Sequence, residues 1–294
     1  MPIDGPTTRV DVDGRTLKIS SLDKVLYPAT ETTKAEVLSY YAQIGPIMLS
    51  YLAERPVTRV RWPHGVGDQS FFEKNLPSGA PPWLRSAKID DITYPLVTNL
   101  ADLTYLVNLN SLEFHIPQWR VAANGGRANP DRLVIDLDPG KPAGLTECCR
   151  VALAVRERLQ GLGMTLFPVS SGSKGMQLYA ALGGDLTSDE VRNLAAQLAQ
   201  ELTKRLPDLV TWKMTKSLRP GKIFFDWSQN VAAKTTICPY SLRGTELPHV
   251  AAPRTWAEVE AAAYGEGVIE QVMFDDALDR LATSGDLLAP LLRW

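Results

Sequence analysis

The sequence has few cysteines, no long apolar run and almost no net charge. Its three cysteines, Cys148, Cys149 and Cys238, are too few for a disulfide framework or a zinc site, which favours a reducing compartment and buried thiols. No run reaches the roughly 18 apolar residues of a membrane span, and the first residues lack the basic and apolar regions of a signal peptide. We therefore expect a cytoplasmic globular protein with no membrane partner.

Positive charge is concentrated in one part of the chain, although the formal net charge is only −2. Residues 204–243 contain eight Lys and Arg residues against two aspartates, Asp208 and Asp226, whereas residues 245–294 carry an acidic excess. The net charge argues against indiscriminate binding to nucleic acid. A local basic surface nevertheless fits a specific site for a polyanion.

Strand and helix patterns are mixed without strict alternation, which predicts an α+β or mixed α/β fold. Capping boxes are expected at Thr33 with Glu36 and at Thr187 with Glu190, and the Asp13-Gly14 turn predicts a hairpin. The hairpin is expected at 1–20, helices at 33–52, 101–109, 146–162, 188–206 and within 255–283, and strands at 57–62, 70–73, 92–98, 112–116, 132–138, 166–169, 176–179 and 222–227.

The chain shows neither an internal repeat nor a low-complexity linker. We therefore expect one domain, 1–294, with an N-terminal lobe of about 1–125 and a C-terminal lobe of about 126–294. The segment 124–130, with its two adjacent glycines, is the best candidate for a flexible joint between the lobes.

Three carboxylates in two apolar segments are the most informative feature of the chain. Asp136 and Asp138 lie two residues apart in a strand, so their side chains point to the same face. Asp226 lies in a second apolar, strand-like run, 223–227. Like charges beside a core need a cation or donors between them, and Mg²⁺ or Mn²⁺ is the cation that prefers oxygen ligands. Asp136 and Asp138 alone are also compatible with a strand end at which the two aspartates cap a turn before Pro139.

A Gly/Ser loop, 170–175, lies between two expected strands. Its glycines allow backbone amides to approach an anion, its hydroxyls donate hydrogen bonds, and Lys174 supplies charge. The spacing is not that of a Walker loop. Alone the loop is better explained as a turn with a solvated lysine. However, one helix and one strand separate it from the two-aspartate strand, which favours a position near the metal.

Two further groups of polar side chains accompany these segments. His115 shares a strand face with Glu113 and Pro117, and we favour a substrate contact over a structural histidine. Donors and cations surround Asp226 in sequence, a pattern that a polyanion bound beside a metal would need. The members of this basic series are Lys216, Arg219, Gln229, Lys234 and Arg243.

Adjacent aromatic residues, Phe71 and Phe72, precede Lys74 in an expected strand. Neighbouring strand residues face opposite ways, so one ring is expected at the surface, where it could stack on a nucleobase. The alternative, with both rings in the core, is equally compatible with these residues alone.

The motifs, in this order, resemble the polymerase domain of bacterial ligase D and its stand-alone primase-polymerase relatives in the archaeo-eukaryotic primase superfamily. The resemblance implies an α+β fold with two mixed β-sheets flanked by helices around a central active-site cleft. It rests on residues 23–28, 61–63, 71–74, 81–84, 115–120, 136–140, 171–175, 215–219, 225–230, 234–236 and 239–244.

The resemblance implies a role for each matching residue. Asp136, Asp138 and Asp226 match a catalytic triad that holds two Mn²⁺ or Mg²⁺ ions. Six residues match positions that contact the incoming nucleotide, namely His115, Ser171, Ser173, Lys174, Gln229 and Arg243. Positions that contact DNA match Lys24 and Lys34 for a downstream 5′-phosphate, Phe71 and Phe72 for the template, and Arg61, Lys74, Lys216, Arg219 and Lys234.

The family is known for template-directed synthesis that favours ribonucleotides and fills short gaps. The resemblance implies NTP, and also dNTP, as substrates, gapped or nicked DNA with a 5′-phosphate as partner, and a place on the bacterial nucleoid. A 2′-hydroxyl both donates and accepts hydrogen bonds, and Ser171 and His115 are our candidates to meet it.

Two departures from the family pattern affect the expected task. The segment 87–95 is shorter than the corresponding ligase D segment, which belongs to the loop that bridges two DNA ends, and Val60 stands where a basic residue is frequent. The 294 residues also contain no ligase or nuclease motif. Together these departures favour gap filling in excision repair.

Other functions remain open at this level. One is an end-joining polymerase that acts with a DNA ligase and a Ku-type partner, and another is a non-catalytic DNA-gap binding module. A metal-dependent glycosyltransferase could also use Asp-x-Asp, but the third aspartate and the basic series argue against it.

Overall fold

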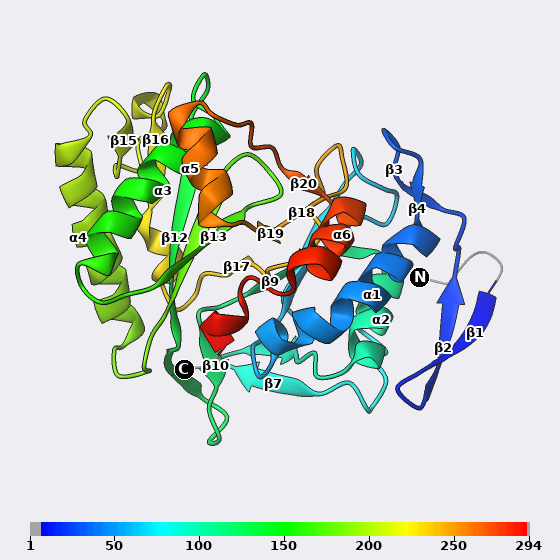
Figure 1. The fold of residues 1–294 in the computed structure, drawn as a ribbon. Coiled ribbons are helices and arrows are strands. Elements are labelled where there is room, and N and C mark those ends of the chain that lie inside the picture. The colour runs from blue at the N-terminus through cyan, green and yellow to red at the C-terminus, as the bar shows by residue number, and fades with distance from the viewer. Residues whose placement is uncertain (1–6, 293–294) are drawn as a thin grey trace.

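The computed structural model describes residues 7–292. Two bodies lie side by side, one carrying helices α3, α4 and α5 and the other carrying α1, α2 and α6 (Figure 1). Each body is built on its own sheet, and a hydrophobic core fills the space between sheet and helices in each. The α+β fold class is therefore confirmed.

The first body contains a six-stranded sheet whose pairs are antiparallel except for the parallel pair β15–β16. Its central strand carries alternating side chains: Leu133, Ile135 and Leu137 are buried in the core beneath the helices. Asp136 and Asp138 therefore face the other way. The elements are β15 (Val210–Thr211), β16 (Ile223–Asp226), β12 (Arg132–Pro139), β14 (Met176–Ala181), β13 (Leu166–Ser170), β19 (Ala252–Pro253), α3 (Leu145–Gln160), α4 (Ser188–Arg205) and α5 (Trp256–Tyr264).

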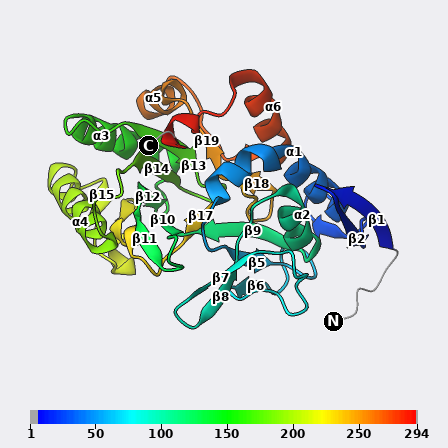
Figure 2. The ribbon, with the colours of Figure 1, turned by 90° about the horizontal axis from the view of Figure 1, so that it is seen from below.

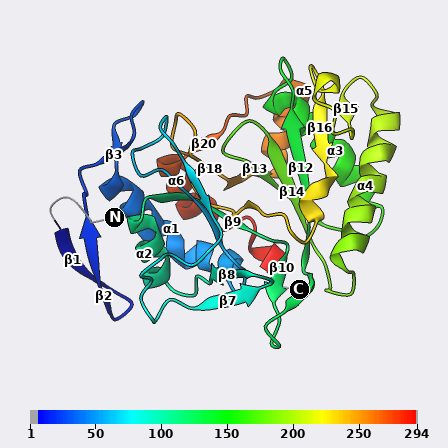
Figure 3. The ribbon, with the colours of Figure 1, turned by 180° about the vertical axis from the view of Figure 1, so that it is seen from behind.

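The second body contains a four-stranded antiparallel sheet. Tyr41 and Phe114 pack edge to face in its core, and the Tyr41 hydroxyl donates to the Leu112 carbonyl at 2.5 Å. The elements are β17 (Thr236–Ile237), β9 (Ser111–Ile116), β5 (Thr58–Arg61), β6 (Phe71–Glu73), α1 (Lys34–Leu52), α2 (Leu100–Asn108) and α6 (Phe274–Ser284). From behind, β12 and β16 lie on one side of the molecule and β9 on the other (Figure 3).

Short hairpins and turns complete the described chain, and the hairpins β1–β2 and β7–β8 project from the second body (Figure 2). The strand pairs are β1 (Thr7–Val12) with β2 (Arg15–Ser20), β3 (Val25–Tyr27) with β4 (Thr32–Thr33), β7 (Ser86–Ile89) with β8 (Ile92–Pro95), β10 (Trp119–Val121) with β11 (Arg127–Pro130), and β18 (His249–Val250) with β20 (Val272–Met273). The 3₁₀ turns are η1 (Lys216–Leu218), η2 (Trp227–Asn230) and η3 (Ala289–Leu292).

Most expected elements form within two residues of their predicted ends. Both capping boxes are present, and the Asp13-Gly14 turn joins β1 to β2; the part of the expected hairpin before Thr7 lies outside the described residues. The strand expected at 92–98 ends at Pro95, because a proline cannot donate to a ladder. Within residues 7–292 no helix is both long and apolar enough to cross a membrane.

The segment expected as a flexible joint is a paired hairpin, β10–β11, whose turn is closed by the Gly125 N–H donating to the Ala122 carbonyl at 2.8 Å. The division into lobes near residue 125 stays a prediction. The chain also returns to the second body late in the sequence, since β17 pairs with β9 and residues 237–242 share the core of α1.

One carboxylate fastens the C-terminal segment to the second body. Asp286 accepts hydrogen bonds from the hydroxyl of Tyr51 at 2.5 Å and from that of Tyr240 at 2.6 Å. It also accepts from the Leu288 N–H at 3.0 Å. Hydrogen bonds to a charged acceptor are stronger than neutral ones, so this contact holds residues 286–288 against α1.

Replacing this carboxylate tests its contribution to stability. Asp286→Ala leaves two tyrosine hydroxyls without their acceptor, and we expect the free energy of unfolding to fall by about 3 kcal/mol. Urea unfolding followed by circular dichroism measures the change. Asp279→Ala, at an exposed aspartate of α6, is the matched control. A loss for Asp286→Ala no greater than that of the control would contradict the assignment.

Candidate active site

The sheet register brings two of the three aspartates directly opposite each other. Asp136 pairs with Asp226 across β12–β16 and with Gln177 across β12–β14. Gln177 Nε2 donates to Asp136 Oδ1 at 3.3 Å. Gln229 Nε2 lies between the two aspartates, 3.5 Å from Asp136 Oδ2 and 3.2 Å from Asp226 Oδ2. Amide donors thus occupy part of the space between like charges.

Two lysines supply the remaining compensation. Lys174 Nζ lies 3.6 Å from Asp138 Oδ1, and Lys234 Nζ lies 3.6 Å from Asp226 Oδ2. Ser228 caps Asp226 through its backbone N–H at 3.0 Å and through its hydroxyl, which Lys234 also contacts. Each outer aspartate therefore has one lysine within 4 Å, whereas Asp136 forms no ion pair among the described residues.

The crowding of negative charges makes the central aspartate, Asp136, a weaker acid. Burial, followed by the charges of Asp138 and Asp226, raises the pKa of Asp136 to about 7. Gln177 and Arg243 act in the opposite direction but do not outweigh them. A carboxyl group in such a field would ionise more readily if a cation were added, because opposite charge favours the ionised form.

The residues fit a hard divalent cation by donor chemistry. Three carboxylates supply oxygen ligands of the kind that Mg²⁺ and Mn²⁺ prefer, and Gln229 Oε1 is buried without a hydrogen-bond partner among the described residues. Over residues 7–292 no three His, Cys, Asp or Glu side chains already stand in a metal-binding arrangement. The two-metal site therefore stays a prediction.

The Gly/Ser loop packs tightly against β12 and Arg243. Ser171 Oγ accepts from the N–H groups of Ser173 at 3.3 Å and Gly175 at 3.2 Å. A Cβ at Gly175 would lie 2.2 Å from the Leu137 carbonyl oxygen, and one at Gly172, where φ is +71°, would lie 2.5 Å from Arg243 Cγ. Only glycine permits this approach, which brings Lys174 to Asp138.

A glutamine from the C-terminal segment holds both ends of this loop. Gln271 Oε1 accepts from the Gly172 N–H at 2.7 Å, and its Nε2 donates to the Gly175 carbonyl at 3.1 Å. The Gly172 N–H is thereby already used. The N–H groups of Ser173 and Gly175 are also used, because they donate to Ser171 Oγ.

His115 belongs to a second group that adjoins the carboxylates. Its Nε2 lies 2.6 Å from Glu113 Oε2, while Glu113 Oε1 accepts from the Gly244 N–H at 2.8 Å and lies 3.3 Å from Arg243 Nε. Burial opposes ionisation of Glu113, but His115 and Arg243 together hold its pKa below the usual range. Because Arg243 also lowers the pKa of Asp136, its charge acts on both groups.

Both phenylalanines of β6 are exposed, Phe71 by 42% and Phe72 by 58%. The alternative prediction, that both rings lie in the core, is wrong. The prediction that one ring lies at the surface accounts for only one of the two exposed rings. The reason is that β6 is a three-residue edge strand, which no further strand covers. The Phe72 ring lies 6.3 Å from the His115 ring, edge to face, so it borders the same surface.

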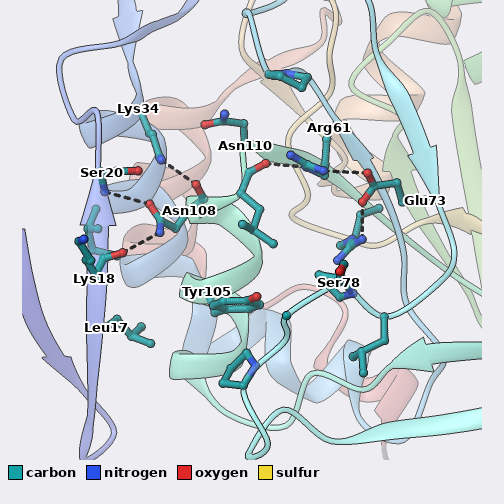
Figure 4. Close-up of a pocket in the computed structure, with 18 of the residues that line it drawn as sticks. Leu17, Lys18, Ser20, Lys34, Arg61, Glu73, Ser78, Tyr105, Asn108 and Asn110 are labelled. Atoms are coloured by element: carbon teal, nitrogen blue, oxygen red, sulfur yellow. Dashed lines mark hydrogen bonds and ion pairs between the residues drawn. The ribbon is translucent and has the colours of Figure 1, made fainter. Parts of the chain in front are cut away.

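A pocket of about 1110 Å³ lies beside this surface, between β2, α2 and the segment 72–83 (Figure 4). Lys24 and Lys34 both line it. Lys34 is only 2% exposed, and its Nζ donates to the Asn108 carbonyl at 2.6 Å. Burial and then the charge of Lys24 lower its pKa to about 8. Among the described residues neither lysine forms an ion pair with a carboxylate, which is typical of an anion site.

The other predicted DNA contacts divide between two places. Arg61 and Lys74 line the pocket, where Arg61 pairs with Glu73 at 2.7 Å. Arg219 holds its guanidinium 3.6 Å from the centre of the Phe224 ring, and Phe224 pairs with Asp138 across β12–β16. Arg219 also donates a hydrogen bond to the Met214 carbonyl. Lys216 is exposed in η1.

Sequence reasoning missed Gln177, Gln271 and Asn108 as parts of these sites. Gln177 is a polar residue inside an apolar strand, a signal that could have been followed. Gln271 and Asn108 act through contacts with residues 96 and 74 positions away, and no local pattern marks them.

Comparisons with known proteins agree with this geometry. A sequence model described as "LigD, primase-polymerase domain" matches residues 33–288. The chain is 48% identical over 279 residues to the multifunctional non-homologous end joining protein LigD of Mycolicibacterium smegmatis, covering 94% of this chain and 36% of that protein. It is 33% identical over 272 residues to the bifunctional LigD of Bacillus subtilis, covering 92% of this chain and 43% of that protein.

Among solved structures, the polymerase domain of Mycobacterium tuberculosis ligase D in complex with DNA matches with a TM-score of 0.89 and 46% identity, over 94% of this chain and 98% of that chain. The fold is therefore the archaeo-eukaryotic primase fold. The chain belongs to the LigD primase-polymerase domain family, and it spans about a third of the length of its mycobacterial relatives.

The buried lysine of the pocket predicts a gain in stability when it is removed. A pKa lowered from 10.5 to about 8 corresponds to about 3 kcal/mol of unfavourable free energy, and losing the bond to Asn108 offsets part of it. We expect Lys34→Met to raise the free energy of unfolding by about 1 kcal/mol at pH 7.

The pH dependence checks the cause. The penalty is complete below the folded pKa of about 8 and disappears as pH rises toward the unfolded value, so the advantage of Lys34→Met is expected to shrink between pH 8 and pH 10.5. Urea unfolding at several pH values measures it, with the exposed Lys204→Met as control. A variant less stable than wild type by more than about 1 kcal/mol at pH 7 would refute the interpretation.

Proposed function

We propose that this domain catalyses template-directed, metal-dependent nucleotidyl transfer and fills short DNA gaps that carry a downstream 5′-phosphate, with a preference for ribonucleotides. The observation that carries the proposal is the cluster of Asp136, Asp138 and Asp226 with Lys174 and Lys234 at its edges. A chain with this arrangement presents carboxylates for cations and cations for phosphates on one surface. That combination suits a nucleoside triphosphate better than it suits a neutral substrate.

The charged residues divide the chemistry between them. A divalent cation bound by Asp136, Asp138 and Asp226 would supply positive charge to the attacking and leaving oxygens. Lys174, Lys234 and Arg243 would hold the triphosphate and offset the charge that spreads over it during transfer. Gln229, whose Oε1 has no partner among the described residues, would orient the nucleotide between the carboxylates and the loop.

Recognition of a ribose would use one side chain with a free hydrogen-bond acceptor and one with a free donor. Glu113 can only accept, so His115 Nε2 donates in their hydrogen bond, and Nδ1 of the neutral imidazole would act as an acceptor. Ser171 Oγ accepts from the loop, so its O–H remains free to donate. A 2′-hydroxyl needs one acceptor and one donor, and these two side chains would provide them.

The DNA would be held on the second body. Phe72, exposed beside His115, would stack on a template base. The buried Lys34 and the half-buried Lys24, without carboxylate partners among the described residues, would bind the 5′-phosphate across the gap. A preference for gaps also agrees with the tight β7–β8 hairpin, in which Asp90 at the turn is paired with Arg127 of the neighbouring hairpin.

End joining is the second candidate function, because the curated relatives are named for it. Those proteins are longer than this chain, and a DNA ligase and a Ku-type protein are the partners it would need. Bridging of two 3′-overhanging ends by the isolated domain would favour end joining over gap filling. Extension restricted to gaps would favour the first candidate.

A carboxylate substitution tests nucleotidyl transfer. Asp138→Asn removes one charged ligand, and we expect extension of a primer in a one-nucleotide gap, with Mn²⁺ and labelled ribonucleotides, to fall at least about 100-fold. Its stability is expected to stay equal or to rise, because like-charge repulsion is relieved. Asp208→Asn, at an exposed aspartate, is the control. Undiminished extension by Asp138→Asn, or phosphate-dependent binding with no incorporation by wild type, would overturn the proposal.

A titration tests the 5′-phosphate contact. The gain in affinity from a downstream 5′-phosphate is expected to decline as pH rises through about 8, where free Lys34 loses its proton, by up to about tenfold per pH unit. The phosphate is doubly charged throughout, since its second pKa is about 6. Fluorescence anisotropy with and without the phosphate measures the gain. Lys34→Met is expected to abolish it and Lys204→Met to leave it intact; a gain that is constant from pH 7 to pH 9.5 would contradict the assignment.

A further inference from the structure

The pocket beside β6 is larger and more varied than a phosphate requires. Its volume of about 1110 Å³ is slightly above the range of sites that enclose whole small molecules, about 300–1,000 Å³. A single phosphate group would occupy only the part that Lys24 and Lys34 line. The remaining space calls for another part of the same ligand.

The charge of the residues that line the pocket favours the end of a nucleic-acid strand as its ligand. One carboxylate, Glu73, faces the pocket, and it already pairs with Arg59 and Arg61. The cations that line the pocket are Lys18, Lys24, Lys34, Arg59, Arg61 and Lys74. In a chain of net charge −2, this surplus favours a ligand with more than one phosphate.

An aromatic ring, Tyr105, lies on the same wall of the pocket as the contact that Lys34 makes. Tyr105 and Asn108 are three residues apart in α2, so they lie on one face about 4.5 Å apart along the axis. Asn108 accepts from Lys34, and Tyr105 lies on the same wall, further along α2 (Figure 4). The half-buried Tyr105 ring is fixed edge to face against Trp83, with centroids 5.8 Å apart.

Buried polar atoms around this space lack partners. The Arg59 side chain is 1% exposed, and neither its Nε nor its Nη1 has a hydrogen-bond partner among the described residues. Asn110 Oδ1, also at the pocket, is likewise unpaired there. Such atoms are unfavourable unless a ligand supplies the missing donor or acceptor, and a nucleobase edge offers both.

We propose that this pocket takes the entire 5′-terminal nucleotide of the downstream strand, with its phosphate on Lys24 and Lys34 and its base drawn out of the duplex and stacked against Tyr105. The inference rests on the proposed gap recognition and extends it from a phosphate to a nucleotide. Removing that base from its pair costs a few kcal/mol, and stacking on an aromatic ring with contacts to Arg59 offsets this. The domain would then open one template position beyond the gap.

The test measures binding alone, in EDTA and without nucleotides, so that catalysis is not involved. Gapped duplexes carry a downstream strand with a 5′-phosphate and either a normal or an abasic terminal nucleotide. With an abasic template position opposite the terminus, so that no pair must be broken, we expect the wild-type domain to bind the normal terminus at least about 5-fold more tightly than the abasic one, as stacking of one base predicts. The normal terminus opposite an intact template base is expected to bind more weakly than the same terminus opposite the abasic position, because its pair must be broken.

Variants assign the effect to the ring. Tyr105→Ala is expected to lose the preference for a normal over an abasic terminus and to keep the gain from the phosphate, whereas Tyr105→Phe is expected to keep both. Tyr264→Ala, at an exposed tyrosine, is the matched control. The wild-type comparison does not depend on whether Tyr105→Ala folds.

The outcomes separate this inference from the function beneath it. A gain from the 5′-phosphate without any effect of the terminal base, or weaker binding when the template position is abasic, would overturn the nucleotide pocket and leave gap recognition standing. Absence of the phosphate gain itself would remove the proposed gap recognition.

Discussion

Crowding of like charges on one face of a sheet is the constraint around which the first body is arranged. The antiparallel register of β12 and β16 sets Asp136 opposite Asp226, and the strand period sets Asp138 on the same face. Carboxylates so close cannot all remain ionised without compensation. Lys174 from the Gly/Ser loop, Gln177 from β14, Gln229 from η2 and Lys234 from the residues after η2 converge on them. The glycines of the Gly/Ser loop allow Lys174 to approach.

The second body shows the opposite imbalance. Lys34 is buried at the start of α1 with only a backbone carbonyl as its recorded acceptor, and Lys24 lies near enough to lower its pKa. Both bodies therefore retain charge that lowers the stability of the folded chain. Natural sequences tolerate such local conflicts mainly where a ligand resolves them. Arg243, which acts on Glu113 and Asp136 together, and Phe72, which borders His115, connect the two regions into one surface.

Local patterns in the sequence predict much of this and miss what depends on distant pairing. Alternation in β12 is sufficient to put Asp136 and Asp138 on one face, and capping boxes locate the starts of α1 and α4 because those contacts span three residues. The pairing of β17 with β9 joins residues about 120 positions apart. Which strand lies at an edge is likewise a property of the whole sheet, so the exposure of both Phe71 and Phe72 could not be derived from β6 itself.

The functional residues follow the same division. The resemblance carried by ordered motifs assigned roles to the aspartates and to the loop, but residues that hold them, such as Gln177 and Gln271, become visible only when the strands are assembled. The pocket shows even more clearly that a site can become visible only in the assembled fold. Its walls come from β2, α2 and the segment 72–83, and no one of these segments carries a recognisable nucleotide motif.

Binding of Mn²⁺ tests the role of the carboxylates most directly, because it needs neither DNA nor turnover. Electron paramagnetic resonance of Mn²⁺ with a non-hydrolysable ribonucleoside triphosphate can compare wild type, Asp226→Asn and the exposed control Asp208→Asn. We expect wild type and the control to bind the ion alike. Asp226→Asn is expected to bind it at least about 10-fold more weakly, because even the loss of a group that only supports a ligand lowers metal affinity by that factor and here a direct ligand is lost. Equal Mn²⁺ affinity in all three proteins would contradict a metal site at these aspartates.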